Sequence, residues 1–334
     1  MNPVFSVFDC DCMARAIDIA RYGRYTTGYN PNVGCVIAKN EQIIGEGWHK
    51  VFGGPHAEVN ALRSLHEDAV GATAYVTLEP CSHYGKTPPC ANALIQAGVA
   101  RVVVAMADPN PLVAGNGIQL LQSAGITVSV GLMSEQAAAL NQDYLHRLMT
   151  GRLRVYIRLT AALSAAVEMN LPHVVWINHD ASLDDIRQRR AQAGAIVACA
   201  EIAHADLTGL LIRHDELPPD VLPHVDVSTF NAPVRIFIDR TGRFDYHARY
   251  TGSVSAPVYR VTADEVPPVD PAVLNGGAHW VLPFDDSGVN FPELMKRIAT
   301  LPVNSLWIEA DGLVDTPGSL AVIAGALGFQ RIEQ

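Results

Sequence analysis

The chain alternates between strand-like and helix-like segments along most of its length, and this alternation limits its fold more than any other feature. In the first part of the chain, short apolar runs have the length and residue types of strands. They lie at residues 33–38, 42–48, 72–76, 101–105 and 126–130, and helical patterns lie at 10–23, 56–65, 88–97 and 118–124. Elements in this order form a sheet with helices on its faces, so we expect an α/β domain.

A second α/β pattern follows residue 150. A longer helix, predicted over residues 134–149, ends before Gly151, and strand and helix signals then alternate again. Strands are expected at residues 153–159, 174–177, 195–199, 210–212, 235–239, 258–261, 279–282 and 306–309, and helices at 183–192 and 292–301. The chain is therefore expected to form two domains, at residues 1–150 and 151–334.

The composition supports two cores and argues against two kinds of partner. Of the 334 residues, 49% are hydrophobic and 17% are charged, which is enough apolar material for two cores. The 34 acidic residues exceed the 24 basic ones and give a net charge of −10, so we expect no nucleic-acid partner. The sequence has no long apolar run, and its start lacks the basic segment followed by an apolar segment that is typical of a signal peptide. We therefore expect a soluble cytoplasmic protein without membrane contact.

A histidine, a glutamate and two cysteines form the strongest chemical signal. Glu58 lies two residues after His56, and eight residues separate Cys81 from Cys90. One imidazole and two thiolates leave the fourth position of a tetrahedral zinc ion open to water, as in catalytic sites. Glu58, near a helix start, is then placed to act as general acid and base without binding the metal. The pattern predicts a deaminase with one Zn²⁺ per chain.

Three strings around these residues resemble one known family. They are NPNVGCV at 30–36, HAEVNAL at 56–62 and TLEPCSHYGKTPPC at 77–90. Zinc deaminases that act on nucleic-acid bases have only two residues between the cysteines, so the longer spacing is itself informative. Residues 10–150 closely resemble the deaminase half of the bifunctional deaminase/reductase of riboflavin biosynthesis, the RibD type.

The resemblance implies a cytidine-deaminase-like, three-layer α/β/α fold for the first domain. It also implies the reaction, in which water replaces the 2-amino group of 2,5-diamino-6-(5-phosphoribosylamino)pyrimidin-4-one to give 5-amino-6-(5-phosphoribosylamino)uracil. Zinc is then bound by His56, Cys81 and Cys90, and Glu58 is catalytic. The residues that fall on the family's substrate pocket are Asn30, His49, His83, Lys86, Asp108 and Asn110. Lys86 is expected to pair with the substrate phosphate.

The second half of the chain resembles the reductase half of the same family. Trp176-Ile177, Arg190-Ala191 and the segment at 304–309 carry this resemblance. The family continues its first strand with a lysine and a Ser-Leu-Asp-Gly stretch. This chain has Thr160 and then Ser-Ala-Ala-Val at 164–167, so both the lysine and the Asp-Gly pair are absent.

The family's glycine-rich loop for the cofactor phosphates also differs in this chain. Asp311 and Asp315 lie where that loop would hold a pyrophosphate, and like charges disfavour phosphate binding. We therefore expect a degenerate and truncated dihydrofolate-reductase-like α/β domain that has lost reductase activity and does not bind NADPH well. Arg190 and Glu309 are then structural polar residues. Because the family's reductase half makes subunit contacts, a homodimer or another homo-oligomer is expected.

Several alternatives stay open at this stage. Other residues could bind NADPH, which would make the chain bifunctional. A nucleic-acid base deaminase shares the zinc chemistry but needs a basic surface, which the net charge of −10 disfavours. A zinc-stabilised binding protein without catalysis is a third alternative, and individual pocket residues could be ordinary turn or surface residues. The sequence also does not separate riboflavin synthesis from another branch that uses the same intermediate.

Overall fold

The chain forms two compact units. The computed structural model describes residues 5–83, 88–110, 114–159, 174–178, 180–200, 214–242, 256–263, 271–286, 288–310, 313, 323 and 325. Unit 1 comprises Met1–Met149 and Pro223–Thr229, and unit 2 comprises Thr150–Leu222 and Phe230–Gln334. Among the described residues, no helix is long and apolar enough to cross a membrane.

Unit 1 is built on a mixed sheet with strand order β2-β1-β3-β4-β5. Its strands are β1 (Gly34–Lys39), β2 (Gln42–Trp48), β3 (Thr73–Val76), β4 (Arg101–Val104) and β5 (Thr127–Val130). The hairpin partner β2 and the central β3 both run antiparallel to β1, whereas β3, β4 and β5 are parallel. The carboxyl ends of β3 and β4 therefore meet at one edge of the sheet, where ligands of α/β proteins usually bind.

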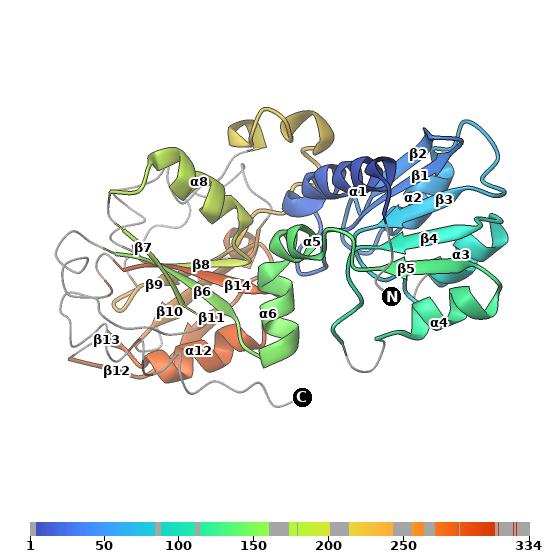
Figure 1. The fold of residues 1–334 in the computed structure, drawn as a ribbon. Coiled ribbons are helices and arrows are strands. Elements are labelled where there is room, and N and C mark those ends of the chain that lie inside the picture. Colours follow the sequence, from blue (N-terminus) through green and yellow to red (C-terminus); the bar gives the residue numbers. More distant parts are fainter. Residues whose placement is uncertain are drawn as a thin grey trace. The chain divides into compact units, whose positions relative to one another are not determined.

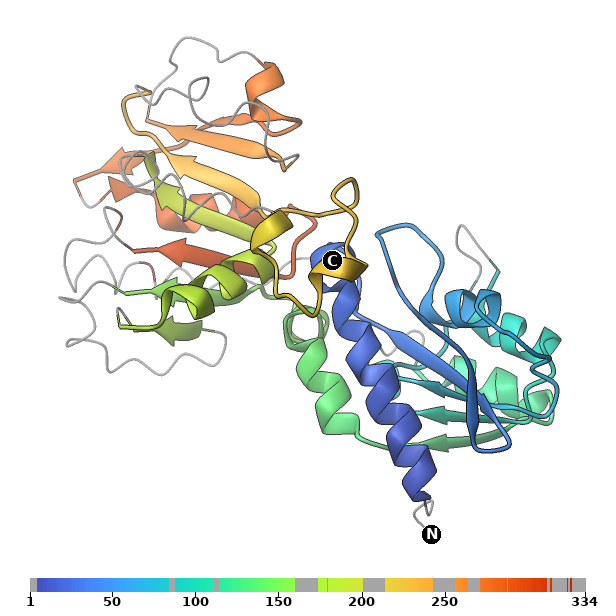
Figure 2. The ribbon, with the colours of Figure 1, turned by 90° about the horizontal axis from the view of Figure 1, so that it is seen from above.

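Helices cover both faces of this sheet and give three layers (Figures 1 and 2). One face carries α1 (Val7–Ala20) and α5 (Ser134–Leu140), with the short 3₁₀ helix η1 (Arg21–Tyr25) after α1. The other face carries α2 (Ala57–Arg63), α3 (Cys90–Gln96) and α4 (Asn116–Ser123). This is the cytidine-deaminase-like architecture that the resemblance implied, and that prediction is confirmed.

The long helix predicted over residues 134–149 is wrong in one respect, because it breaks at Asn141. The structure has α5 before this residue and α6 (Gln142–Thr150) after it. The Asn141 side chain is buried and reaches across the chain: its Oδ1 accepts from the Asn32 N–H at 2.7 Å, and its Nδ2 donates to the Asn32 carbonyl at 2.9 Å. Asn141 leaves helical geometry in order to make these two bonds, which helical periodicity alone does not reveal.

Unit 2 contains a sheet of seven described strands in the order β11-β10-β9-β8-β14-β6-β7. They are β6 (Arg154–Arg158), β7 (Val174–Ile177), β8 (Ala195–Cys199), β9 (Val234–Ile238), β10 (Val258–Thr262), β11 (His279–Val281) and β14 (Ser305–Glu309). Every neighbouring pair is parallel. Such strands are buried on both faces, which explains their nearly continuous apolar runs.

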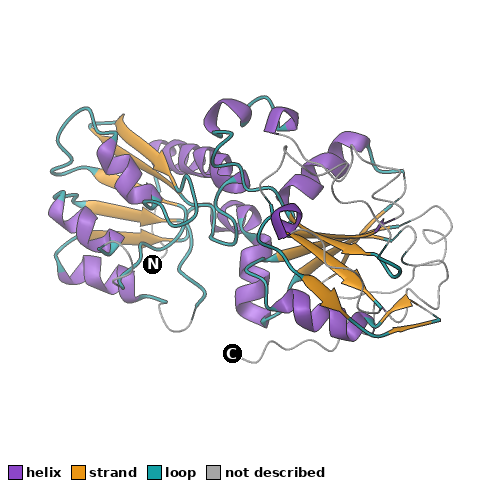
Figure 3. Cartoon of the chain, turned by 180° about the vertical axis from the view of Figure 1, so that it is seen from behind, coloured by secondary structure: helices purple, strands orange, loops and turns teal. Residues whose placement is uncertain are grey.

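Two helices flank the sheet of unit 2 on opposite faces, α8 (Leu183–Gln192) and α12 (Phe291–Ala299) (Figures 1 and 3). Shorter elements complete the described part of unit 2, namely α11 (Pro271–Leu274), the β12 (Phe284–Asp285) and β13 (Gly288–Val289) hairpin and η2 (His214–Glu216). The 3₁₀ helix η3 (Leu222–His224) begins at the last residue before the segment that belongs to unit 1. The expected strand at 210–212 and the segments at 160–167, at Asp311 and at Asp315 lie outside the described residues.

Buried charges in unit 2 are paired at the carboxyl end of β14. Glu309 is 1% exposed and Arg190 is 3% exposed, and the Arg190 Nε donates to Glu309 Oε1 at 2.6 Å. Arg158 donates to the other carboxylate oxygen at 3.3 Å, and the Trp307 indole N–H also donates to Glu309. These residues form a compensated ionic cluster inside the fold.

A short segment from the second half of the chain belongs to unit 1. His224, within Pro223–Thr229, stacks on Tyr22 with ring centroids 3.8 Å apart. Trp48 contacts both rings edge-on, with centroid distances of 5.2 Å to Tyr22 and 5.8 Å to His224. The boundary between the two units is therefore not a single point in the sequence.

Candidate active site

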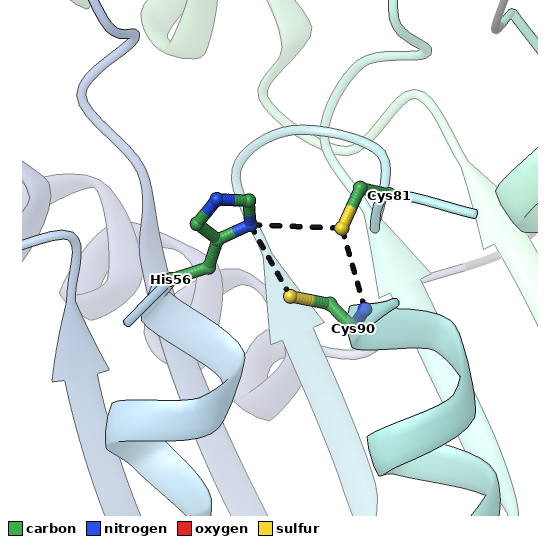
Figure 4. Close-up of side chains that lie close together, drawn as sticks. All are labelled: His56, Cys81 and Cys90. Atoms are coloured by element: carbon green, nitrogen blue, oxygen red, sulfur yellow. Dashed lines mark hydrogen bonds between the residues drawn. The ribbon is translucent and has the colours of Figure 1, made fainter. Parts of the chain in front are cut away.

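The histidine and the two cysteines singled out in the sequence lie together in unit 1, at the beginnings of two helices (Figure 4). His56 is the N-cap residue of α2, and Cys90 is the first residue of α3. Cys81 follows the segment that leaves the carboxyl end of β3. The fold thus brings together residues that are 25 and 34 positions apart.

The separations of the three side chains match those of ligands on one small cation. His56 Nδ1 lies 3.6 Å from Cys81 Sγ and 3.3 Å from Cys90 Sγ, and all three atoms lie within 4.8 Å of one another. Tetrahedral zinc with typical bond lengths places its nitrogen and sulfur ligands about 3.6 Å apart. The soft thiolates and the imidazole also suit zinc better than magnesium or calcium. These residues therefore fit Zn²⁺ in both geometry and donor type.

The pKa values of the two thiols shift in opposite directions. Hydrogen bonding by Cys90 and by His56 lowers the pKa of Cys81 well below its usual value, and the Cys90 N–H donates to Cys81 Sγ at 3.3 Å. The same hydrogen bond with Cys81, together with burial, raises the pKa of Cys90. One thiolate is thus favoured by the chain itself, and a cation between the sulfurs favours the second.

Glu58 lies in the first turn of α2 and is 3% exposed. Burial, followed by the charge of the Cys81 thiolate, raises the pKa of its carboxyl to about 7, against smaller lowering effects of its own backbone N–H, His56 and Cys90. A carboxyl that titrates near neutral pH can both accept and donate a proton. Its place beside the three ligand-type residues is the one expected for a general acid and base.

Asn30 and His49 form a hydrogen-bonded pair next to the His56 ring. His49 is 4% exposed, and its Nδ1 lies 3.1 Å from the Pro55 carbonyl oxygen, which can only accept. Its Nε2 therefore lacks a proton and accepts from Asn30 Nδ2 at 3.1 Å. Burial lowers the pKa of His49, which favours this neutral form. The rings of His49 and His56 meet edge to face at 5.5 Å.

The remaining predicted pocket residues lie beyond β3 and β4. The Asn110 N–H donates to Asp108 Oδ1 at 2.9 Å, which holds the turn after β4. Burial raises the pKa of Asp108, the Asn110 N–H lowers it, and the charges of Glu79 and His83 have smaller, opposite effects. His83 is exposed. Lys86 lies outside the described residues.

Sequence reasoning missed one buried acid and one tyrosine beside this turn. Glu79 is 7% exposed and accepts hydrogen bonds from the turn that carries Asp108. The Asp108 charge and, more strongly, burial raise the pKa of Tyr144 in α6 to about 12. The signal for Glu79 in the sequence is a carboxylate that stands between an apolar strand and Pro80.

Comparison with known proteins assigns both halves. Residues 7–106 match the family described as cytidine and deoxycytidylate deaminase zinc-binding region. Residues 131–314 match the RibD C-terminal domain. The riboflavin biosynthesis protein RibD of Escherichia coli (strain K12) is 41% identical over 305 residues, covering 89% of this chain and 80% of that protein. The chain belongs to the RibD family. Its first domain is a deaminase domain, and its second is a RibD reductase-type domain.

Two further comparisons refine this assignment. The structure of RibD from Acinetobacter baumannii (form 1) superposes with a TM-score of 0.69 at 38% identity, covering 92% of this chain and 85% of that one. A diaminohydroxyphosphoribosylamino-pyrimidine deaminase of Buchnera aphidicola subsp. Acyrthosiphon pisum (strain APS) is 55% identical over 151 residues. Those residues are 45% of this chain and 99% of that relative, so a RibD-type deaminase half also occurs alone.

Proposed function

We propose that the chain is a zinc-dependent deaminase of 2,5-diamino-6-(5-phosphoribosylamino)pyrimidin-4-one that acts in the cytoplasm. The observation that supports this most directly is the group of His56, Cys81 and Cys90 with the buried Glu58 beside it. Two of the relatives named above are a riboflavin biosynthesis protein and a diaminohydroxyphosphoribosylamino-pyrimidine deaminase, and these names support the proposed reaction. The product is 5-amino-6-(5-phosphoribosylamino)uracil, and the leaving group is ammonia.

The residues of the chain divide the chemistry among them. Zinc held by His56, Cys81 and Cys90 supplies Lewis acidity that makes water acidic enough to attack at neutral pH. Glu58 accepts a proton from the attacking water and delivers it to the neighbouring ring nitrogen as the C–O bond forms. It then transfers the remaining hydroxyl proton to the 2-amino group, which leaves as ammonia when the C–N bond breaks and the carbonyl forms. Its buried site and raised pKa suit both transfers.

The pocket residues bind and orient the pyrimidine. We assign the polar edges of the ring and ribose to Asn30, Asp108, Asn110 and His83, and the phosphate to Lys86. His49 acts through Asn30, because both of its ring nitrogens face groups of the chain. The bond to His49 holds the Asn30 Nδ2 atom toward His49 and thereby sets the direction of the Asn30 Oδ1 atom.

The second domain retains the family's fold, and we propose that it has lost NADPH-dependent reduction. The changed residues at 160–167 and the aspartates at 311 and 315 support this. The match of residues 131–314 to the RibD C-terminal domain favours a second candidate, a bifunctional deaminase/reductase. A role in assembling a homodimer or another homo-oligomer is the remaining prediction for this domain.

One assay separates these candidates. Zinc-loaded protein is given the diaminopyrimidinone phosphate, and ammonia release and NADPH oxidation are followed separately. Ammonia release without NADPH oxidation is the expected result. Oxidation of NADPH after deamination would establish the bifunctional enzyme, and absence of ammonia would refute the proposed substrate.

A further inference from the structure

The carboxylate of Glu79 connects three parts of unit 1 that are separate in the sequence. Its Oε2 accepts from the N–H groups of Asp108 at 3.1 Å and Gly115 at 3.0 Å. Its Oε1 accepts from the N–H groups of Gly117 at 2.9 Å and Ile118 at 3.3 Å. The first oxygen therefore joins the two ends of the segment from Asp108 to Gly115, and the second binds the beginning of α4.

Helix α4 depends on this carboxylate because it lacks a cap of its own. Its N-cap residue is Gly115, which has a left-handed backbone and no side chain to accept from the first-turn amides. The first amides of a helix have no partner within the helix, and a negative charge there is favourable. Glu79 supplies both the acceptors and the charge from a distant point in the chain.

Close packing fixes the direction of α4 against the same segment. A Cβ at Gly117 would lie 1.9 Å from the Pro80 carbonyl oxygen and 3.2 Å from Glu79 Oε1. Glycine is therefore required there, and the helix start rests directly on residues 79–80. The Glu79 N–H also donates to the Met106 carbonyl at 3.0 Å, which extends the pairing of β3 with β4.

These contacts relate the metal-ligand segment to the turn that carries pocket residues. Cys81 is two residues beyond Glu79, and Asp108 is held by Glu79 on one side and holds Asn110 on the other. We propose that Glu79 is a positioning residue that sets the place of Asp108 and Asn110 relative to Cys81 and thereby the affinity for substrate. This inference rests on the proposed deaminase function.

The test compares the zinc-loaded wild-type protein with Glu79→Gln. The glutamine side chain has the same size but no charge, and its amide nitrogen replaces one of the two carboxylate oxygens. That nitrogen is a donor and faces backbone N–H groups, which are donors too. We expect KM for the diaminopyrimidinone phosphate to rise about tenfold or more, as for loss of charged hydrogen bonds, with kcat changed less than about threefold. Zinc content should stay at that of the wild type.

A second readout does not depend on activity. Hydrogen–deuterium exchange of the peptide around residues 107–118 should become faster in Glu79→Gln, because one of the two pairs of amides, Asp108 with Gly115 or Gly117 with Ile118, loses its acceptor. Glu46→Gln is the matched control, since Glu46 forms a partly exposed ion pair with Arg15 at 2.6 Å. Neither its KM nor exchange in the 107–118 peptide should differ from the wild type.

The outcomes separate the inference from the proposed function. Faster exchange with an unchanged KM would overturn the positioning role, and unchanged exchange would overturn the hydrogen-bond geometry. Failure of the wild type to release ammonia from this pyrimidine would instead refute the proposed function. If Glu79→Gln does not fold, Glu79→Asp keeps the charge on a shorter side chain, and an intermediate rise in KM is expected; an unchanged KM would again count against the inference.

Discussion

The two units use buried charge in different ways. In unit 1, the buried acids Glu58 and Glu79 face candidate metal-ligand side chains or backbone amides near the carboxyl ends of β3 and β4. In unit 2, the buried acids Glu309 and Asp239 face arginines, at 2.6 Å from Arg190 and 3.3 Å from Arg260. Burying an acid is costly in either case, but only an acid that does not face an opposite charge keeps a capacity for proton transfer or for ligand alignment.

Unit 1 contains an internal control for this comparison. Asp9 in α1 is 4% exposed and faces Arg101 at 2.7 Å, at the beginning of β4. Asp108 lies beyond the other end of the same strand. One end of β4 is thus stabilised by a compensated pair, and the other carries the candidate pocket. Buried acids that face an arginine and buried acids that do not therefore occur within one unit, and not only in different units.

Removal of zinc should have the largest effect on deamination. A strong chelator is expected to abolish ammonia release, because no other group described near Glu58 could acidify water. Addition of Zn²⁺ should restore it. Metal content is measured by atomic emission alongside ammonia release, and full activity in zinc-free protein would refute the proposed metal centre.

Glu58→Gln should come next, with a fall in kcat for deamination of about 10³-fold, within the usual range for general acid–base catalysis. The amide keeps the shape of the side chain but cannot shuttle a proton. Zinc content should stay near that of the wild type, which separates this effect from loss of the metal. Retention of more than about a tenth of the activity would assign proton transfer to another group.

Glu309→Gln tests the compensated cluster of unit 2. Neutralising this buried acid leaves Arg190 and Arg158 facing a neutral side chain, and we expect a loss of about 3 kcal/mol in the free energy of unfolding. Urea unfolding is followed by tryptophan fluorescence, since Trp307 donates to Glu309. Glu293→Gln, in the exposed pair with Lys296, is the control and should cost less than about 1 kcal/mol. A lowered kcat for deamination in the folded variant would break the comparison.

Asp9→Asn should have the smallest effect, and its size should depend on pH. Burial raises the pKa of Asp9, but Arg101, the Ser6 N–H and the Tyr75 hydroxyl together lower it from 3.8 to about 2. A lowered pKa stabilises the folded state above pH 3.8, and this contribution is lost as the pH falls toward about 2.

The expected loss for Asp9→Asn is about 2 kcal/mol at neutral pH, from the size of that shift. The difference from the wild type should shrink between about pH 4 and pH 2. Asp18→Asn, at a partly exposed acid in the same helix, serves as the control. A difference that is the same at neutral and acidic pH would show that packing, not charge, stabilises this site.

Periodicity predicted most of the described elements, because apolar residues in this chain report faithfully on the buried faces of strands and helices. It failed where one polar side chain overrides a pattern. Asn141 breaks a helix to reach Asn32, 109 positions away, and His224 packs on Tyr22 in the other half of the chain. Contacts of this kind are specific to the tertiary structure and leave no period in the sequence.

The candidate site was predicted as a set of residues but not as an arrangement. Residue types and spacing were enough to single out His56, Cys81 and Cys90, because thiolates and imidazole are rarely combined for other reasons. They did not show the hydrogen bond between His49 and Asn30, or the bond from the Asp108 N–H to Glu79. Such contacts depend on the tertiary structure, and several local patterns are compatible with each residue type.

The return of Pro223–Thr229 to unit 1 has a consequence for how the protein is made. During synthesis from the N-terminus, the five strands of unit 1 are complete long before His224 leaves the ribosome. Tyr22 and Trp48 therefore lack their contact with the His224 ring until that part of the chain has been translated. A nascent chain that pauses between these points would expose the faces of Tyr22 and Trp48 that His224 contacts in the folded protein.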